Sequence, residues 1–148
     1  MDGPKAGRSS VRRKVRGDAS GRMRFFFDNN LSPHLAKGML AFQEDVTHLV
    51  EHFAPDAKDV DWLPVIASNK WPLVTRDERI RKNPAELNAL RRYGIGAFFL
   101  GGKNRNRCQI IQQLVRNWPR IKELASKTSP PFAFRIPPTG SKIERIPL

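Results

Sequence analysis

Short apolar segments alternate in this chain with segments of helical periodicity, and this alternation restricts the fold more than any other feature. Four apolar segments predict strands, at residues 25–27, 46–50, 73–75 and 95–100. Helical patterns lie between them, at residues 33–40, 61–67 and 86–90. Strands separated by helices of about ten residues indicate βαβ units. We therefore expect an α/β fold with a mostly parallel sheet.

Several residues predict where the helices begin and end. Ser32 is a good N-cap, and Pro33 suits the first helical position. Pro64 lacks an amide hydrogen, so we expect the second helix to begin at about Asp61. Gly94 is placed to end the third helix.

The last third of the chain predicts a long helix followed by a short β extension. Apolar residues recur at helical spacing between Ile110 and Ile121. Pro119 is expected to kink this helix or divide it. The tail from Phe132 to Ile146 has the pattern of two short strands around a Pro- and Gly-containing turn.

The first 22 residues differ from the remainder in composition. They contain seven Lys and Arg, two acids, and only two large apolar residues after Met1. Such a segment buries too little apolar area to offset the entropy of ordering it. We expect residues 1–22 to form a disordered basic arm and residues 23–148 to form one domain, a size that suits a single core.

Cellular location is predicted from what the sequence lacks. It has no apolar run long enough for a membrane helix and no apolar signal segment at its start. Its single cysteine, Cys108, excludes an internal disulfide, and we expect that residue to be buried. These features predict a cytoplasmic protein that is not associated with membranes.

The net charge is the first indication of function. The chain has 27 Lys and Arg against 14 Asp and Glu, a formal net charge of +13. Such an excess favours a polyanionic partner, which could be RNA, DNA or an acidic membrane face, although charge alone says nothing about catalysis.

Acidic residues follow two of the predicted strands. Asp28 comes directly after the first strand, Asp77 and Glu78 follow the third, and Asp59 and Asp61 lie near the start of the second helix. The carboxyl ends of parallel strands meet at one edge of a sheet, where ligands bind. Acids pooled there repel each other, and a bound Mg²⁺ ion would relieve that repulsion.

Each of these acids also has a simpler interpretation. A single Asp after a strand is most often a turn residue, and Asp59 or Asp61 could cap the helix that follows. Asp77 could pair with a neighbouring arginine on the surface. The residues alone leave open which of Asp59 and Asp61 belongs to a metal site.

Cations flank the predicted acidic edge in two clusters. They are Arg76, Arg79, Arg81 and Lys82 after the third strand, and Lys103, Arg105 and Arg107 after the fourth. The second cluster is interleaved with glycine and asparagine ahead of a helix, a composition that suits phosphate contacts. We interpret both clusters as RNA-binding.

Three stretches resemble the PIN-like nucleases, in particular the VapC-type toxins with a compact PIN-like domain. They are the strand and turn at residues 25–32, the segment Asp59-Val60-Asp61-Trp62, and the segment Leu73-Val74-Thr75-Arg76-Asp77. Their order and spacing also match. The sequence departs from many relatives at Asn29, where they have an acid.

The resemblance implies a three-layer α/β/α PIN-like sandwich that cleaves RNA, often tRNA. It implies a site for Mg²⁺ or Mn²⁺ held by Asp28, Asp59 and Asp77, with Glu78 as a candidate fourth acid and Thr75 orienting a carboxylate or water. It favours Asp59 over Asp61. It also implies an antitoxin protein as partner, and a homodimer.

The sequence therefore predicts a Mg²⁺-dependent endoribonuclease, the toxin of a toxin–antitoxin pair. The main alternative is a non-catalytic RNA-binding protein that uses the same basic sheet edge. A phosphotransfer receiver with Asp28 as phosphoacceptor is disfavoured, because receivers place that acid on a central strand after an earlier acidic pair.

Overall fold

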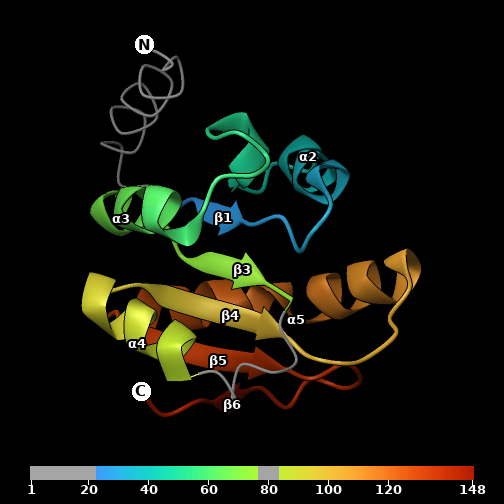
Figure 1. Ribbon diagram of the computed structural model, residues 1–148. Helices are drawn as coiled ribbons and strands as arrows, with labels where there is room; N and C mark the ends of the chain where they lie inside the picture. The colour runs from blue at the N-terminus through green and yellow to red at the C-terminus, as the bar shows by residue number, and fades with distance from the viewer. Residues whose placement is uncertain (1–22, 77–83) are drawn as a thin grey trace. The chain divides into compact units, whose positions relative to one another are not determined.

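The computed structural model describes residues 23–76 and 84–148 (Figure 1). The basic arm predicted for residues 1–22 lies outside the described residues. The chain divides into two compact units, the first ending at Trp71 and the second beginning at Pro72. Each unit is described by itself.

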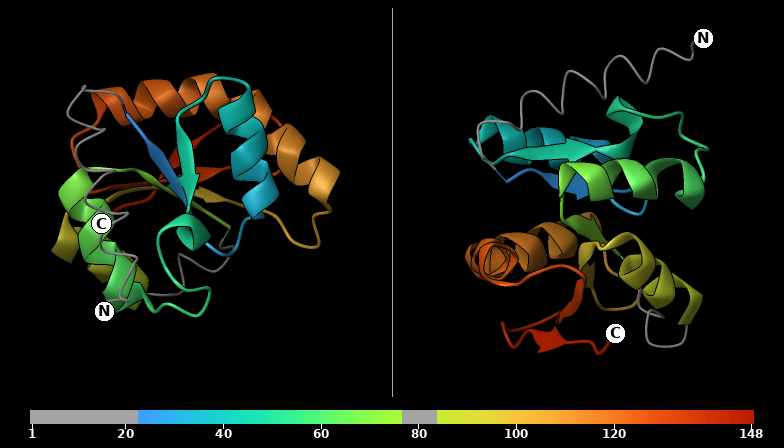
Figure 2. Two further views of the ribbon diagram at one scale, coloured as in Figure 1. Left: turned by 90° about the horizontal axis from the view of Figure 1, so that it is seen from above. Right: turned by 90° about the vertical axis from the view of Figure 1, so that its left-hand side faces the viewer.

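The first unit is built on a pair of parallel strands. Strand β1 (Phe25–Phe27) pairs with β2 (Val46–His48), so that Phe27 lies opposite His48. Helices α2 (Pro33–Ala41) and α3 (Asp59–Asn69) flank this pair, and a short 3₁₀ turn, η2 (Leu49–Glu51), follows β2 (Figure 2). The core of the unit is aromatic.

Phe26 is the centre of that aromatic core. Its ring is fully buried and stacks on Trp62 of α3 at 5.4 Å and on Trp71 at 6.3 Å between centroids. Offset aromatic pairs at these distances contribute about 0.5–1.5 kcal/mol each beyond the burial of their area. The short apolar strand is thereby fixed at its middle residue, which positions the residues that follow it.

The second unit contains a four-stranded sheet in the order β3-β4-β5-β6. Strands β3 (Leu73–Thr75), β4 (Gly96–Leu100) and β5 (Phe132–Ile136) are parallel, and β6 (Glu144–Arg145) is antiparallel to β5. Helices α4 (Pro84–Tyr93) and α5 (Arg107–Lys127) cover opposite faces of this sheet (Figures 1 and 2). The unit thus has three layers.

The fold class predicted from the sequence is confirmed. The described residues form an α/β fold whose paired strands within each unit are parallel, apart from the short C-terminal extension β6, consistent with a PIN-like α/β/α sandwich. Ser32 caps α2 by accepting a hydrogen bond from the His34 amide, with Pro33 at the first position. Gly94 follows α4 with φ +72°, as a C-terminal glycine does.

The prediction that α3 begins at about Asp61 because of Pro64 is wrong, and Pro119 does not divide α5. Helix α3 begins at Asp59 and continues through Pro64, and α5 runs unbroken from Arg107 to Lys127 through Pro119. Each proline lies on an exposed helix face. The carbonyls four residues earlier belong to Val60 and Val115, which are also exposed, so water can replace the missing amide donor.

Two further observations concern exposure. Cys108 is exposed, so the prediction that it is buried is wrong; it lies in the first turn of α5, on the side that faces solvent. No helix in the described part of the chain is long and apolar enough to cross a bilayer.

Candidate functional site

The carboxylate of Asp28 is the centre of the candidate site in the first unit. It follows β1 directly and is only 8 % exposed. Its Oδ1 accepts a hydrogen bond from the Asn30 amide at 3.0 Å, and its carbonyl accepts one from the Leu31 amide. Burial of a carboxylate is costly unless polar partners compensate for the lost water. The buried position of Asp28 therefore marks it as a candidate functional residue.

Two side chains hold the turn after Asp28 in place. The Asn29 amide donates a hydrogen bond to the Pro55 carbonyl at 2.6 Å, which joins the turn to the loop before α3. His48, at the end of β2, donates from Nε2 to the Leu31 carbonyl at 2.7 Å, while its Nδ1 accepts from the Val50 amide. The turn is therefore attached to both neighbouring segments, and it presents Asp28 at the carboxyl edge of β1.

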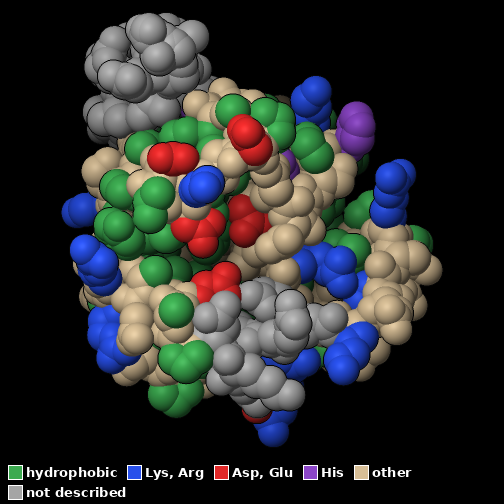
Figure 3. Space-filling model, in the orientation of Figure 1, with side chains coloured by type: hydrophobic (Ala, Val, Ile, Leu, Met, Phe, Trp, Pro, Cys, Tyr) green, Lys and Arg blue, Asp and Glu red, His purple; other side chains and the backbone are tan. Residues whose placement is uncertain are grey.

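The two acids at the start of α3 differ in what they contact. Asp61 Oδ2 accepts a hydrogen bond from the Lys58 amide at 3.0 Å, so Asp61 caps the helix. Asp59 is exposed in the first turn. Because Asp61 already has a structural role, Asp59 is the better candidate for a ligand, as the resemblance implied. Figure 3 shows acidic side chains on the face that carries α3.

The described residues do not by themselves form a metal site. Among residues 23–76 and 84–148, no three His, Cys, Asp or Glu side chains are grouped closely enough to hold a metal ion. Asp77, Glu78, Arg79, Arg81 and Lys82 lie outside the described residues. The two acids that remain, Asp28 and Asp59, offer oxygen atoms, which fit Mg²⁺ or Mn²⁺; Mg²⁺ needs only one or two carboxylates besides water and phosphate.

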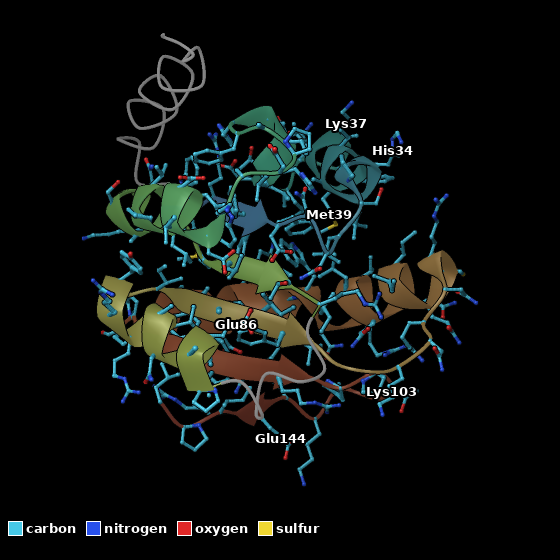
Figure 4. The ribbon with its side chains drawn as sticks, in the orientation of Figure 1. His34, Lys37, Met39, Glu86, Lys103 and Glu144 are labelled. Carbon is cyan, nitrogen blue, oxygen red and sulfur yellow. The ribbon has the colours of Figure 1, made fainter. Side chains whose placement is uncertain are left out.

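The other predicted site residues that the structure describes lie in the second unit. Thr75 is buried at the end of β3, and Arg76 follows it, partly exposed. Lys103 and Arg107 are exposed in the loop between β4 and α5 and in the first turn of α5, and Arg105 is partly exposed (Figure 4). Three of the predicted RNA-binding cations therefore share one loop of one unit.

Charge is divided unequally between the two units. Residues 23–71 contain four Lys and Arg against seven Asp and Glu, a net charge of −3. Residues 72–148 contain sixteen Lys and Arg against five acids, a net charge of +11. Acids thus outnumber cations over residues 23–71, and cations outnumber acids in the second unit.

Comparison with known proteins places the chain in a family. The family model described as "PIN like domain" matches residues 23–102, more than half of the chain. The chain belongs to the PIN-like domain family. No curated protein and no solved structure matches it.

The PIN-like match covers all the candidate acids and stops just after β4. Asp28, Asp59 and Thr75 lie within it, as do the undescribed Asp77 and Glu78. Lys103, Arg105 and Arg107 lie beyond its end, so their assignment rests on this chain alone.

Sequence reasoning missed the residues that support these positions. His48 is 1 % exposed and fixes the turn after Asp28, but no motif or spacing in the sequence points to it. Gln113 and Asn117 are both fully buried on α5. Their signal was present, because both occur at the helical spacing of the apolar residues that face the sheet.

Proposed function

We propose that this PIN-like protein is a metal-dependent endoribonuclease that hydrolyses RNA phosphodiesters. The observation that carries the proposal is the buried Asp28 carboxylate, fixed at the carboxyl edge of β1 in a chain of this family. The net charge of +11 on residues 72–148 supports RNA as the substrate.

Each candidate residue has a stated role in this proposal. Asp28, Asp59 and Asp77 would hold Mg²⁺ or Mn²⁺, with Glu78 as a fourth acid. Thr75 would orient a carboxylate or water through its hydroxyl. When bound, a divalent ion supplies Lewis-acid activation of the phosphate and of an attacking water. The two cation clusters, at residues 76–82 and 103–107, would bind the RNA backbone and so help to hold the substrate.

The resemblance to VapC-type toxins supports a more specific proposal. The protein would be the toxin of a toxin–antitoxin pair, acting in the cytoplasm on tRNA-like RNA, with a cognate antitoxin as partner and a homodimer as its assembly. Expression of the wild-type chain is then expected to arrest growth, and expression of the Asp28→Asn variant is not. Equal growth with both chains would contradict the toxin assignment and leave the nuclease proposal to be tested in vitro.

Cleavage of labelled tRNA by the purified chain tests the nuclease proposal. We expect cleavage with Mg²⁺ or Mn²⁺, none with EDTA, and a rate about 100-fold or more lower for Asp28→Asn. Asn can still accept the hydrogen bond from the Asn30 amide, so the fold should be retained. Asp56→Asn is the matched control, because Asp56 is an exposed acid in the loop before α3, and it should cleave like the wild type.

Binding without cleavage would favour the alternative function. If the wild-type chain binds tRNA but does not cleave it with either metal, the protein is a non-catalytic RNA-binding module. The positive charge of the second unit would then be its functional feature. Cleavage that persists undiminished in Asp28→Asn would also reject the proposed site.

A further inference from the structure

A group of cations in the second unit extends beyond the loop that the sequence indicated. The exposed side chains of Arg116 on α5 and Lys142 in the turn between β5 and β6 belong with those of the β4–α5 loop. We define the basic surface as the following five residues: Lys103, Arg105, Arg107, Arg116 and Lys142. Figure 3 shows Lys and Arg side chains on the side that carries this loop. All five lie outside the PIN-like match, which ends at Gly102.

Hydrogen bonds join the three segments that carry the basic surface. Arg105 Nη2 donates to the Pro138 carbonyl at 2.6 Å, and Arg116 Nη1 donates to the Gly140 carbonyl at 3.2 Å. Both bonds end on the turn between β5 and β6. Because a guanidinium has five donors and a carbonyl carries no net charge, each arginine retains its positive charge and further donors.

The buried side chain of Gln113 also links the β4–α5 loop to the end of β5 and the turn that follows it. Its Nε2 donates to the carbonyls of Gly101, Ile136 and Pro137 at 2.9, 3.1 and 3.0 Å. Gly102 packs so closely that a Cβ atom there would lie 2.7 Å from Pro138 Cβ. The loop, the helix and the turn therefore form one preorganised structure, which lowers the entropy cost of binding an extended ligand.

The positive charges of this surface repel each other when no anion is bound, which disfavours the folded protein. Arg107 occupies the first turn of α5, where the helix dipole is positive, and that turn contains no acid. Asn106 caps the helix with its side chain, so the arginine is not needed as a cap. An anion bound beside Arg107 would offset both the repulsion among the cations and the repulsion from the dipole.

Two other exposed cations of the second unit, both on α5, are paired with an acid. Arg120 and Lys127 both pair with Glu123 further along α5. The hydrogen bond from Lys127, with that from Arg120, lowers the pKa of Glu123 below its ordinary value. Arg135 lies opposite Glu144 in the β5–β6 ladder, and Glu144 projects from β6 (Figure 4).

We propose that the basic surface binds the sugar–phosphate backbone of a nucleic acid strand outside the family-matched segment. Five cations from three joined segments suit a repeating row of phosphates better than a single small anion. The choice of RNA as the natural ligand rests on the proposed function. The surface would hold the RNA while the acids act on one phosphodiester.

The test is binding of a short, unstructured, labelled RNA to the full chain in EDTA, followed by fluorescence anisotropy. The test variant is Lys103→Gln/Arg116→Gln/Lys142→Gln. The control, Lys37→Gln/Arg91→Gln/Lys122→Gln, removes the same charge at exposed positions elsewhere. We expect the test variant to bind about tenfold or more weakly and to lower the slope of log affinity against log salt by about 2. The control should bind like the wild type.

The outcomes separate this proposal from the nuclease proposal. Equal weakening by both variants would mean that only total charge matters, and it would overturn the basic surface even if the protein cleaves RNA. Selective weakening supports the surface even if no metal gives cleavage. DNA of the same sequence tests whether the 2′-hydroxyl contributes. If polyglutamate displaces RNA as well as unlabelled RNA does, the surface takes acidic protein and the proposal is rejected. Circular dichroism confirms that each variant is folded.

Discussion

The position of Asp28 depends on single residues that the strand pattern does not contain. An apolar run ending in Asp predicts a buried strand with a carboxylate at its end, and both features are confirmed. What holds the carboxylate is the turn after it, and that turn is fixed by Asn29 and His48. Neither contact follows from sequence spacing, because both join segments that are far apart in the chain.

Replacing His48 should destabilise the protein. His48→Ala leaves the Leu31 carbonyl and the Val50 amide without their side-chain partner and opens a cavity under β2, at a cost of about 2–4 kcal/mol in the free energy of unfolding. His34→Ala, on the exposed face of α2, should change it by less than about 0.5 kcal/mol (Figure 4). Urea denaturation of both variants measures the difference. Equal stability of the two would show that the buried histidine does not fix the turn.

At the scale of elements, the hydrophobic pattern located strands β1 to β5 because these strands are largely buried, whereas β6 is exposed. The pattern was wrong where solvent exposure decided the outcome. Pro64 and Pro119 do not end their helices, since the backbone groups they leave unpaired face water. The periodicity of α5 predicts which face is buried. It does not predict that Gln113 and Asn117 on that face are polar because they make buried hydrogen bonds.

A substitution at Gln113 tests whether its buried hydrogen bonds stabilise the protein. Gln113→Leu keeps the volume but removes the donor to three carbonyls, so we expect a loss of about 2–3 kcal/mol in the free energy of unfolding. Gln112→Leu is the matched control, because Gln112 is the exposed neighbour on the same helix. Thermal denaturation should separate the two variants. RNA affinity should also fall in Gln113→Leu at temperatures where the variant is folded, since the loop and the turn lose one of the contacts that join them.

At the scale of the whole molecule, charge is divided between the candidate acids and the basic surface. Two candidate metal ligands, Asp28 and Asp59, lie among residues 23–71, which have a net charge of −3, and the basic surface lies among residues 72–148, which have a net charge of +11. The sequence gives this division directly once the boundary at Trp71 is known, but the boundary comes from the structure. The grouping of Asp28, Asp59 and Asp77 around one cation stays a prediction from the family resemblance, because Asp77 lies outside the described residues.

If the two clusters have separate tasks, their variants should change different kinetic parameters. Asp28→Asn should lower kcat and leave the affinity for RNA unchanged or slightly higher, since a negative charge is removed near a polyanion. Lys103→Gln/Arg116→Gln/Lys142→Gln should raise KM and leave kcat near the wild-type value at saturating RNA. Steady-state cleavage at several RNA concentrations measures both parameters. If the surface variant lowers kcat without changing KM, the cations act in the transition state, and the assignment of separate tasks to the two clusters is wrong.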